Sequence, residues 1–154
     1  ERQVKAAPSD YTVLHLATHG VLDPRVERSY LALAPDGDED GRLTLDEVRR
    51  RDALGDYRLV TLSACESALG NTDEAAWPIN PALAFLENGA RTVVASLWKV
   101  DDAATGAPME VFYTTLAEGD AAAALQHAQT ALLADSATRH PYYWAPFVLL
   151  GDDQ

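Results

Sequence analysis

The chain has 154 residues, and its 24 acidic and 12 basic side chains give it a net charge of −12. This length is enough for one domain with a core of its own. A surface this acidic repels phosphate backbones, which argues against nucleic-acid binding. No apolar stretch approaches the roughly 20 residues of a membrane-spanning helix, residues 1–10 are too polar for a signal peptide, and the single cysteine excludes an internal disulfide bond. We therefore expect a cytoplasmic domain that contacts neither membrane nor nucleic acid.

Four short segments are almost continuously apolar and rich in valine, leucine or threonine, which indicates parallel strands covered on both faces. These segments are residues 11–18, 57–64, 91–98 and 145–151. Helical patterns lie between them, over residues 45–53, 81–88, 102–118 and 121–134. Strands that alternate with helices predict an α/β fold with a mostly parallel sheet.

Local signals mark the starts of several helices. Thr44 and Glu47 match a capping box, T-x-x-E, at the start of the first. Asn80 followed by Pro81 indicates an N-cap and the first residue of the second helix. Pro108 predicts a kink or a later start in the third helix, because proline lacks the N–H that a helix interior uses.

Residues 29–44 interrupt this alternation, and two short strands are expected there around the acidic turn DGDEDG. Four principal strands make a thin sheet for this class of domain, and only about ten residues precede the first strand. We therefore expect a linker over residues 1–10, a domain over residues 11–152, and further N-terminal strands of this fold that are missing from the chain.

Two neighbouring strands of the predicted sheet run into reactive side chains. The first is followed by His19 and Gly20, and the second by Cys65. Reactive groups of α/β sheets collect beyond the carboxyl ends of the strands, so we expect the imidazole and the thiol to lie close together. A thiolate that attacks and an imidazole that protonates the leaving amine are what cleavage of an amide needs. The alternatives are that Cys65 is a packed core residue and that His15, on the first strand, is a core or supporting histidine.

Five segments resemble, in order and spacing, the signature blocks of CHAT-domain proteins, which are prokaryotic cysteine peptidases related to caspases and separases. They are HLATHG (15–20), LSACESALG (62–70), FLENGARTVVASLWKVDD (85–102), VFYTTLAEGDAAAALQHAQTAL (111–132) and HPYYWAPFVLLGD (140–152). His19 also precedes Cys65 by 46 residues, near the roughly 50 of caspases. The stretch NTDEAAWPINPALAFL after Gly70 departs from the glycine- and glutamate-rich sequence that is usual in the family.

The resemblance implies a caspase-like three-layer sandwich, of which residues 11–152 form the larger, C-terminal part. It implies that Cys65 is the nucleophile, that His19 is the catalytic histidine, and that the backbone amides of Gly20 and Cys65 form the oxyanion hole, with no cofactor and no metal. It further implies a protein substrate and a larger regulated protein with a sensor or repeat region, acting in antiviral defence or cell death. A catalytically silent module that only binds other proteins is the alternative.

In caspase-like folds, the stretch after the strand that follows the nucleophile forms the first substrate subsite, and here that stretch is SLWKVDD (96–102). Trp98 offers an apolar wall, whereas Asp101 or Asp102 would hold a basic substrate side chain. Glu66, next to the nucleophile, would also attract a basic group. The alternative that we favour for the two aspartates is the N-cap of the following helix.

The segment DGDEDGRLTLDE, residues 36–47, matches the loop pattern of an EF-hand. Asp36, Asp38, Asp40 and Glu47 would then bind Ca²⁺. An EF-hand also needs a helix before the loop, and the preceding YLALAP indicates a strand instead. We therefore favour a solvated acidic turn over a calcium site.

Overall fold

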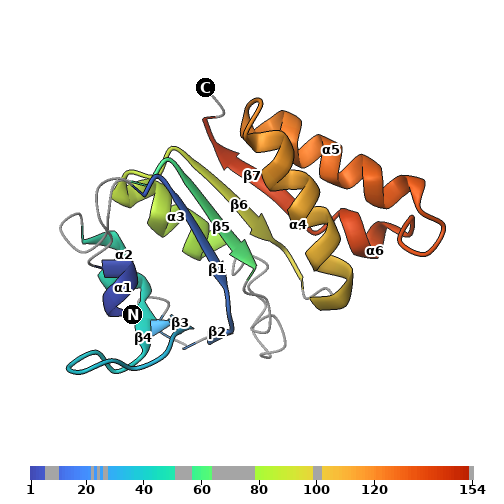
Figure 1. The fold of residues 1–154 in the computed structure, drawn as a ribbon. Helices are drawn as coiled ribbons and strands as arrows, with labels where there is room; N and C mark the ends of the chain where they lie inside the picture. Colours follow the sequence, from blue (N-terminus) through green and yellow to red (C-terminus); the bar gives the residue numbers. More distant parts are fainter. Residues whose placement is uncertain are drawn as a thin grey trace.

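A four-stranded sheet runs through the centre of the computed structural model (Figure 1), which describes residues 1–5, 11–21, 23, 25, 28–50, 57–63, 79–98 and 102–152. In spatial order, its strands are β1 (Val13–Ala17), β5 (Leu59–Ser63), β6 (Thr92–Ser96) and β7 (Phe147–Gly151). β1, β5 and β6 are parallel, and β7 is antiparallel to β6. The predicted α/β fold with a mostly parallel sheet is confirmed.

Helices cover both faces of this sheet, and together they form a three-layer sandwich. The helices of the described residues are α1 (Arg2–Lys5), α2 (Leu45–Arg49), α3 (Ile79–Asn88), α4 (Asp102–Leu116), α5 (Ala121–Ala134) and α6 (Pro141–Trp144). Val60 and Val93 belong to a buried cluster with Phe85 of α3, whereas Val94 belongs to a second cluster with Phe112 of α4. Because alternate residues of the central strands enter opposite clusters, both faces of these strands are buried, as their continuous apolar sequences predict.

β1 differs from the central strands because one of its faces is only partly covered and one of its edges has no partner strand among the described residues. The side chains of Val13, His15 and Ala17 are exposed, while Leu16 is buried. The prediction that this strand is buried on both faces is therefore wrong, since α4 and α5 pack over the other strands of the sheet. Further strands on the N-terminal side stay a prediction.

The third predicted helix continues through its proline. α4 runs from Asp102 to Leu116 with Pro108 inside it, so the predicted later start at this residue is wrong. Pro108 and the adjacent Met109 are buried, and this packing offsets the helical hydrogen bond that proline removes.

No helix in the described ranges combines the length and the apolar character that crossing a membrane requires.

A small antiparallel sheet extends β1 at its carboxyl end. Its strands are β2 (Gly20–Val21), β3 (Tyr30–Ala32) and β4 (Arg42–Thr44), in that spatial order. Leu31 and Leu43 are register partners in this sheet and are almost completely buried. The two short strands predicted within residues 29–44 are thus confirmed.

Residues 1–5 lie in the segment that was expected to be a linker, and they contact the rest of the fold. Val4 of α1 packs against the same buried cluster as α2 and α3. The hydroxyl of Tyr57 donates a hydrogen bond to the Val4 carbonyl at 3.0 Å. α1 therefore anchors this end of the chain to the small sheet and to α2.

Candidate functional site

His19 lies at the junction between the two sheets, after the last residue of β1 and before β2. Its carbonyl accepts a hydrogen bond from the Ala32 N–H at 2.8 Å. The neighbouring Thr18 hydroxyl donates to the Ala32 carbonyl. These two bonds fix the junction to β3, while the His19 side chain is exposed. The small sheet thus holds the backbone of the predicted catalytic histidine at the carboxyl edge of the main sheet.

The register between β1 and β5 relates the predicted catalytic pair. Ala17 and Ser63 are partners in this parallel pair. His19 follows the first partner by two residues and Cys65 follows the second by two residues. Cys65 and the neighbouring Glu66 lie outside the described residues.

The backbone of Gly20 meets one requirement of its predicted role in an oxyanion hole. Gly20 pairs with Leu31, and the bond from the Ala32 N–H to the His19 carbonyl makes this a non-hydrogen-bonded pair. The ladder between β2 and β3 therefore does not use the Gly20 N–H. Gly20 itself is buried.

Trp98 lies at the same carboxyl edge, two residues after β6 ends. Its indole Nε1 donates a hydrogen bond to the Tyr142 carbonyl of α6 at 3.0 Å, and its own carbonyl accepts one from the Ser96 hydroxyl at 2.6 Å. These contacts orient the indole, which is half-buried. Asp101 lies outside the described residues, and Asp102 is the first residue of α4.

His15, predicted to be a core or supporting histidine, contacts an aromatic side chain instead of the core. Its ring lies 5.6 Å from the ring of Tyr113, centre to centre. The Tyr113 hydroxyl donates to the hydroxyl of Thr61, which is fully buried and is the register partner of His15. Partial burial lowers the pKa of His15 below its usual value. The His15 ring thus lies beside a tyrosine that is hydrogen-bonded to the middle of β5.

A family model described as "CHAT domain" matches residues 1–152. The chain belongs to the CHAT-domain family. Two curated relatives are similar to parts of this CHAT domain. Tetratricopeptide repeat protein 28 of Homo sapiens is 42% identical over 71 residues, which cover 46% of this chain and 3% of the relative. The protein of the same name from Mus musculus is 36% identical over 97 residues, covering 62% of this chain and 4% of the relative. The CHAT domain thus spans a very small part of the relatives that it matches.

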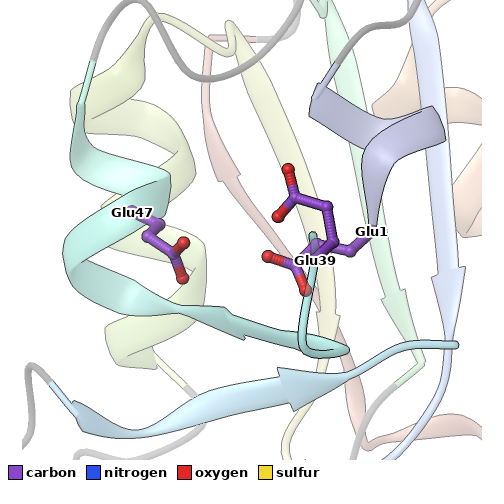
Figure 2. A group of neighbouring side chains, drawn as sticks. All are labelled: Glu1, Glu39 and Glu47. Atoms are coloured by element: carbon purple, nitrogen blue, oxygen red, sulfur yellow. The ribbon is translucent and has the colours of Figure 1, made fainter. Parts of the chain in front are cut away.

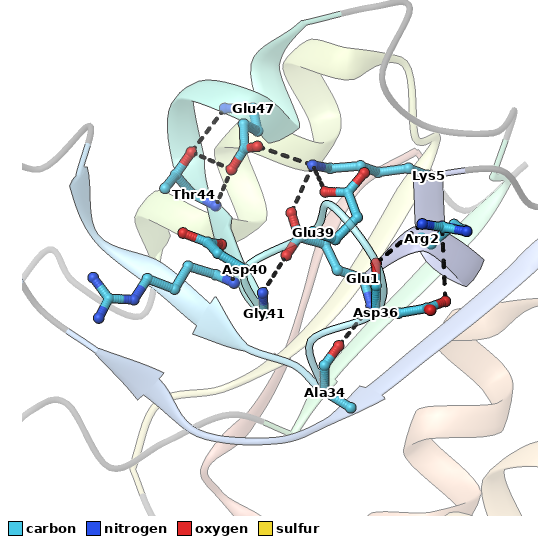
Figure 3. A network of polar contacts seen from close by, with 11 residues as sticks. Glu1, Arg2, Lys5, Ala34, Asp36, Glu39, Asp40, Gly41, Thr44 and Glu47 are labelled. Atoms are coloured by element: carbon cyan, nitrogen blue, oxygen red, sulfur yellow. Dashed lines mark hydrogen bonds and ion pairs between the residues drawn. The ribbon is translucent and has the colours of Figure 1, made fainter.

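A cluster of three carboxylates lies in this CHAT domain on the side of α1 and α2. The carboxylates of Glu1, Glu39 and Glu47 point toward one another, with ligand atoms within 4.8 Å (Figure 2). The ammonium group of Lys5 contacts all three, at 2.6, 2.6 and 2.9 Å respectively (Figure 3). This lysine supplies the positive charge that a metal ion would otherwise bring to the cluster.

The cluster changes the ionisation of its members. Burial by itself would lower the pKa of Lys5, but its hydrogen bonds to the three carboxylates raise that pKa well above its usual value. The hydrogen bond from Lys5 lowers the pKa of Glu39. Burial would raise the pKa of Glu47, but hydrogen bonds from Thr44 and Lys5 lower it overall. Lys5, Glu39 and Glu47 therefore stay charged across the neutral pH range.

The residues of the EF-hand-like segment serve other purposes in this CHAT domain. Asp36 forms an ion pair with Arg2, and Asp40 accepts a hydrogen bond from the Arg42 N–H at 2.9 Å. Strand β3 precedes the segment where an EF-hand has a helix. The predicted capping box is confirmed. The Thr44 hydroxyl accepts a hydrogen bond from the Glu47 N–H, and the Glu47 carboxylate accepts one from the Thr44 N–H. The arrangement fits an acidic turn held by α1.

No sequence pattern identified the cation of the carboxylate cluster, Lys5, or the two residues beside His15, Tyr113 and Thr61. Lys5 is 34 positions from Glu39, and Tyr113 is 52 positions from Thr61. No local pattern links residues so far apart in the chain. The one available signal was the cluster of acidic residues after residue 35.

Proposed function

We propose that this CHAT domain is a cysteine endopeptidase in which His19 and Cys65 form the catalytic pair. The observation that carries the proposal is the register of β1 and β5. Ala17 and Ser63 are partners, and each of the two reactive residues follows its partner by two positions. Equal offsets from paired positions on adjacent parallel strands favour a short distance between the imidazole and the thiol.

The proposed reaction proceeds in two covalent steps. The Cys65 thiolate attacks the carbonyl carbon of the scissile peptide bond, and the Gly20 and Cys65 N–H groups stabilise the oxyanion that forms. His19 donates a proton to the leaving amine as the C–N bond breaks, which leaves a thioester. A water molecule, deprotonated by His19, then hydrolyses the thioester, which releases the acid product and regenerates the thiolate and the protonated imidazole. The Gly20 N–H supports this role because the strand ladder does not use it.

The proposed substrate is a protein segment that extends along the carboxyl edge of the main sheet. Trp98 forms an apolar wall for the substrate side chain next to the cleaved bond, with its indole oriented by Tyr142. Glu66, Asp101 and Asp102 are the proposed contacts for a basic side chain at that position.

The setting of the domain is part of the proposal. The mammalian relatives are named as tetratricopeptide repeat proteins, which supports a module within a larger protein that contains repeats. A cytoplasmic site agrees with the lone cysteine. A role as an effector in prokaryotic antiviral defence or cell death rests on the family resemblance alone.

Thiol reactivity provides the test, because Cys65 is the only thiol in the chain. The rate of alkylation by iodoacetamide, measured across pH, reports the apparent pKa of that thiol. We expect a value well below about 8.5, and we expect it to rise in His19→Ala. His127→Ala is the matched control, since His127 is exposed on α5. Equal curves for the wild type and both variants would refute the catalytic pair.

Peptide cleavage then separates the proposal from a silent binding module. A peptide library incubated with the wild type and with Cys65→Ala should show cleavage by the wild type only. The fold of Cys65→Ala, followed by circular dichroism, should be unchanged. A perturbed thiol without any cleavage, together with binding of a partner protein by both forms, would instead favour the interaction module.

A further inference from the structure

A cavity of about 650 Å³ lies at the amino ends of the parallel strands. Its walls come from the first residues of three strands and from the turn between α4 and α5. Among the lining residues are Val13, Arg58, Leu59, Arg91, Leu116 and Asp120. Figure 1 shows this turn on the side of the sheet where the parallel strands begin.

The cavity is separate from the proposed catalytic site. β1 and β5 run parallel, so their amino ends share one edge of the sheet and their carboxyl ends share the opposite edge. Arg58 precedes β5, whereas Cys65 follows it. The whole length of the strands therefore lies between the cavity and the catalytic segments.

Two arginines stand next to each other in the cavity lining. Arg58 and Arg91 each precede one of the register partners Leu59 and Thr92, and the Arg58 carbonyl accepts a hydrogen bond from the Thr92 N–H at 3.0 Å. Neither guanidinium forms an ion pair or a hydrogen bond within the described ranges, whereas other arginines on the surface pair with carboxylates. In a chain with twice as many acidic as basic side chains, this pair is a local excess of positive charge.

The rest of the lining contains one carboxylate, two threonines and several apolar side chains. Asp120 is the N-cap of α5, and its carboxylate accepts the Ala123 N–H at 2.6 Å. Together with the two arginines, this single carboxylate gives the lining a net charge of +1. Val13, Leu59 and Leu116 provide an apolar wall beside them, and Val13 is 42% exposed.

We propose that this cavity binds a small organic anion. Its carboxylate or phosphate group contacts Arg58 and Arg91. A planar guanidinium group can donate two parallel hydrogen bonds to either kind of acidic group. The apolar body of the anion lies against Val13, Leu59 and Leu116. The volume of the cavity falls within the range of small-molecule sites, and the position at the far edge of the sheet makes binding independent of Cys65.

The test titrates the ¹⁵N-labelled full chain with phenyl phosphate and, separately, with benzoate, followed by backbone amide shifts in NMR spectra. We expect saturable shifts of the lining residues with a dissociation constant below about 1 mM for at least one anion. The tighter of the two probes identifies which acidic group the cavity prefers. Benzyl alcohol, which has the same apolar ring without a charge, should bind at least about tenfold more weakly.

The matched variants are Arg58→Gln, Arg91→Gln and Arg139→Gln. Arg139 is exposed and lies beyond the far end of α5, about 20 Å along a helix of this length. The first two variants should keep the dispersed spectrum of the folded chain and weaken binding by about tenfold each, and the third should bind as the wild type does. Shifts that never saturate, that map to other residues, or that weaken equally in Arg139→Gln would overturn the proposal. Unchanged binding by Cys65→Ala is also required.

Discussion

Replacing Lys5 by methionine should destabilise the domain more than the loss of an ordinary surface ion pair. Its ammonium group contacts three carboxylates, at 2.6, 2.6 and 2.9 Å. The Lys5 side chain is 20% exposed, and the Glu1 side chain is only 1% exposed. Methionine has a similar length and keeps the apolar contacts of the lysine stem, so the variant removes the charge with little change in packing.

The expected loss follows from the burial of Glu1. A charged hydrogen bond contributes about 1.5–3 kcal/mol, and a fully buried charge that loses its partner costs about 3–5 kcal/mol. Because Glu1 keeps a second hydrogen bond, from the Gly41 N–H at 2.8 Å, and because Lys5 is partly solvated, we expect a loss of about 2 kcal/mol at neutral pH. Arg49→Met breaks the exposed pair with Glu87 and should cost less than about 1 kcal/mol.

Urea unfolding followed by tryptophan fluorescence measures both losses, and its pH dependence tests the cause. The lowered pKa values of Glu39 and Glu47 give stability that is present above their usual value of 4.5 and is lost as the pH falls through the lower folded values. The raised pKa of Lys5 gives stability that is fully present below its usual 10.5. The difference between wild type and Lys5→Met should therefore be largest between these two limits and should shrink in acid. Equal losses for the two variants, or a Lys5→Met loss that persists in acid, would refute the reasoning.

Further substitutions test the local structure, each by urea unfolding. Gly41→Ala should lose more than about 1 kcal/mol, because φ is +82° and the new Cβ would lie 2.5 Å from the Leu33 carbonyl. Gly106→Ala, inside α4 with open space around it, should gain up to about 1 kcal/mol, and the same sign for both would contradict the structure. Thr44→Ala should lose about 1 kcal/mol with the capping box, and a neutral result would exclude the cap as a stabilising element. The lowered pKa of His15 makes the wild type gain stability as the pH rises through the usual value of 6.5, and His15→Gln should flatten this part of the profile.

Several elements could be predicted from the sequence because short-range interactions determine them. The capping box of Thr44 and Glu47 needs only residues three positions apart. β5 and β6 were recognisable because strands buried on both faces need continuous apolar sequence, and both are buried along almost their whole length. β1 has the same type of sequence, but Val13, His15 and Ala17 on one of its faces are exposed. Its exposure depends on which strands α4 and α5 cover, and no local pattern contains that information.

The candidate sites also combine features that the sequence predicts with features that only the folded structure determines. The reactive residue types, their order and the family blocks identify His19 and Cys65 as candidates from the sequence itself. The equal offset of these residues from the partners Ala17 and Ser63 is a property of strand register, which depends on packing between segments more than 40 residues apart. Register also brings Arg58 next to Arg91.

The acidic segment at residues 36–47 illustrates why local pattern is insufficient. The sequence alone determined that carboxylates gather there. Only the tertiary structure decided which cation pairs with them, because α1 brings the Lys5 ammonium to Glu39 from 34 positions away. It also decided that β3, held by its hydrogen bonds to β2 and β4, stands where an EF-hand would need a helix. Charge is a property of the residues, whereas its neutralisation depends on distances that only the folded chain establishes.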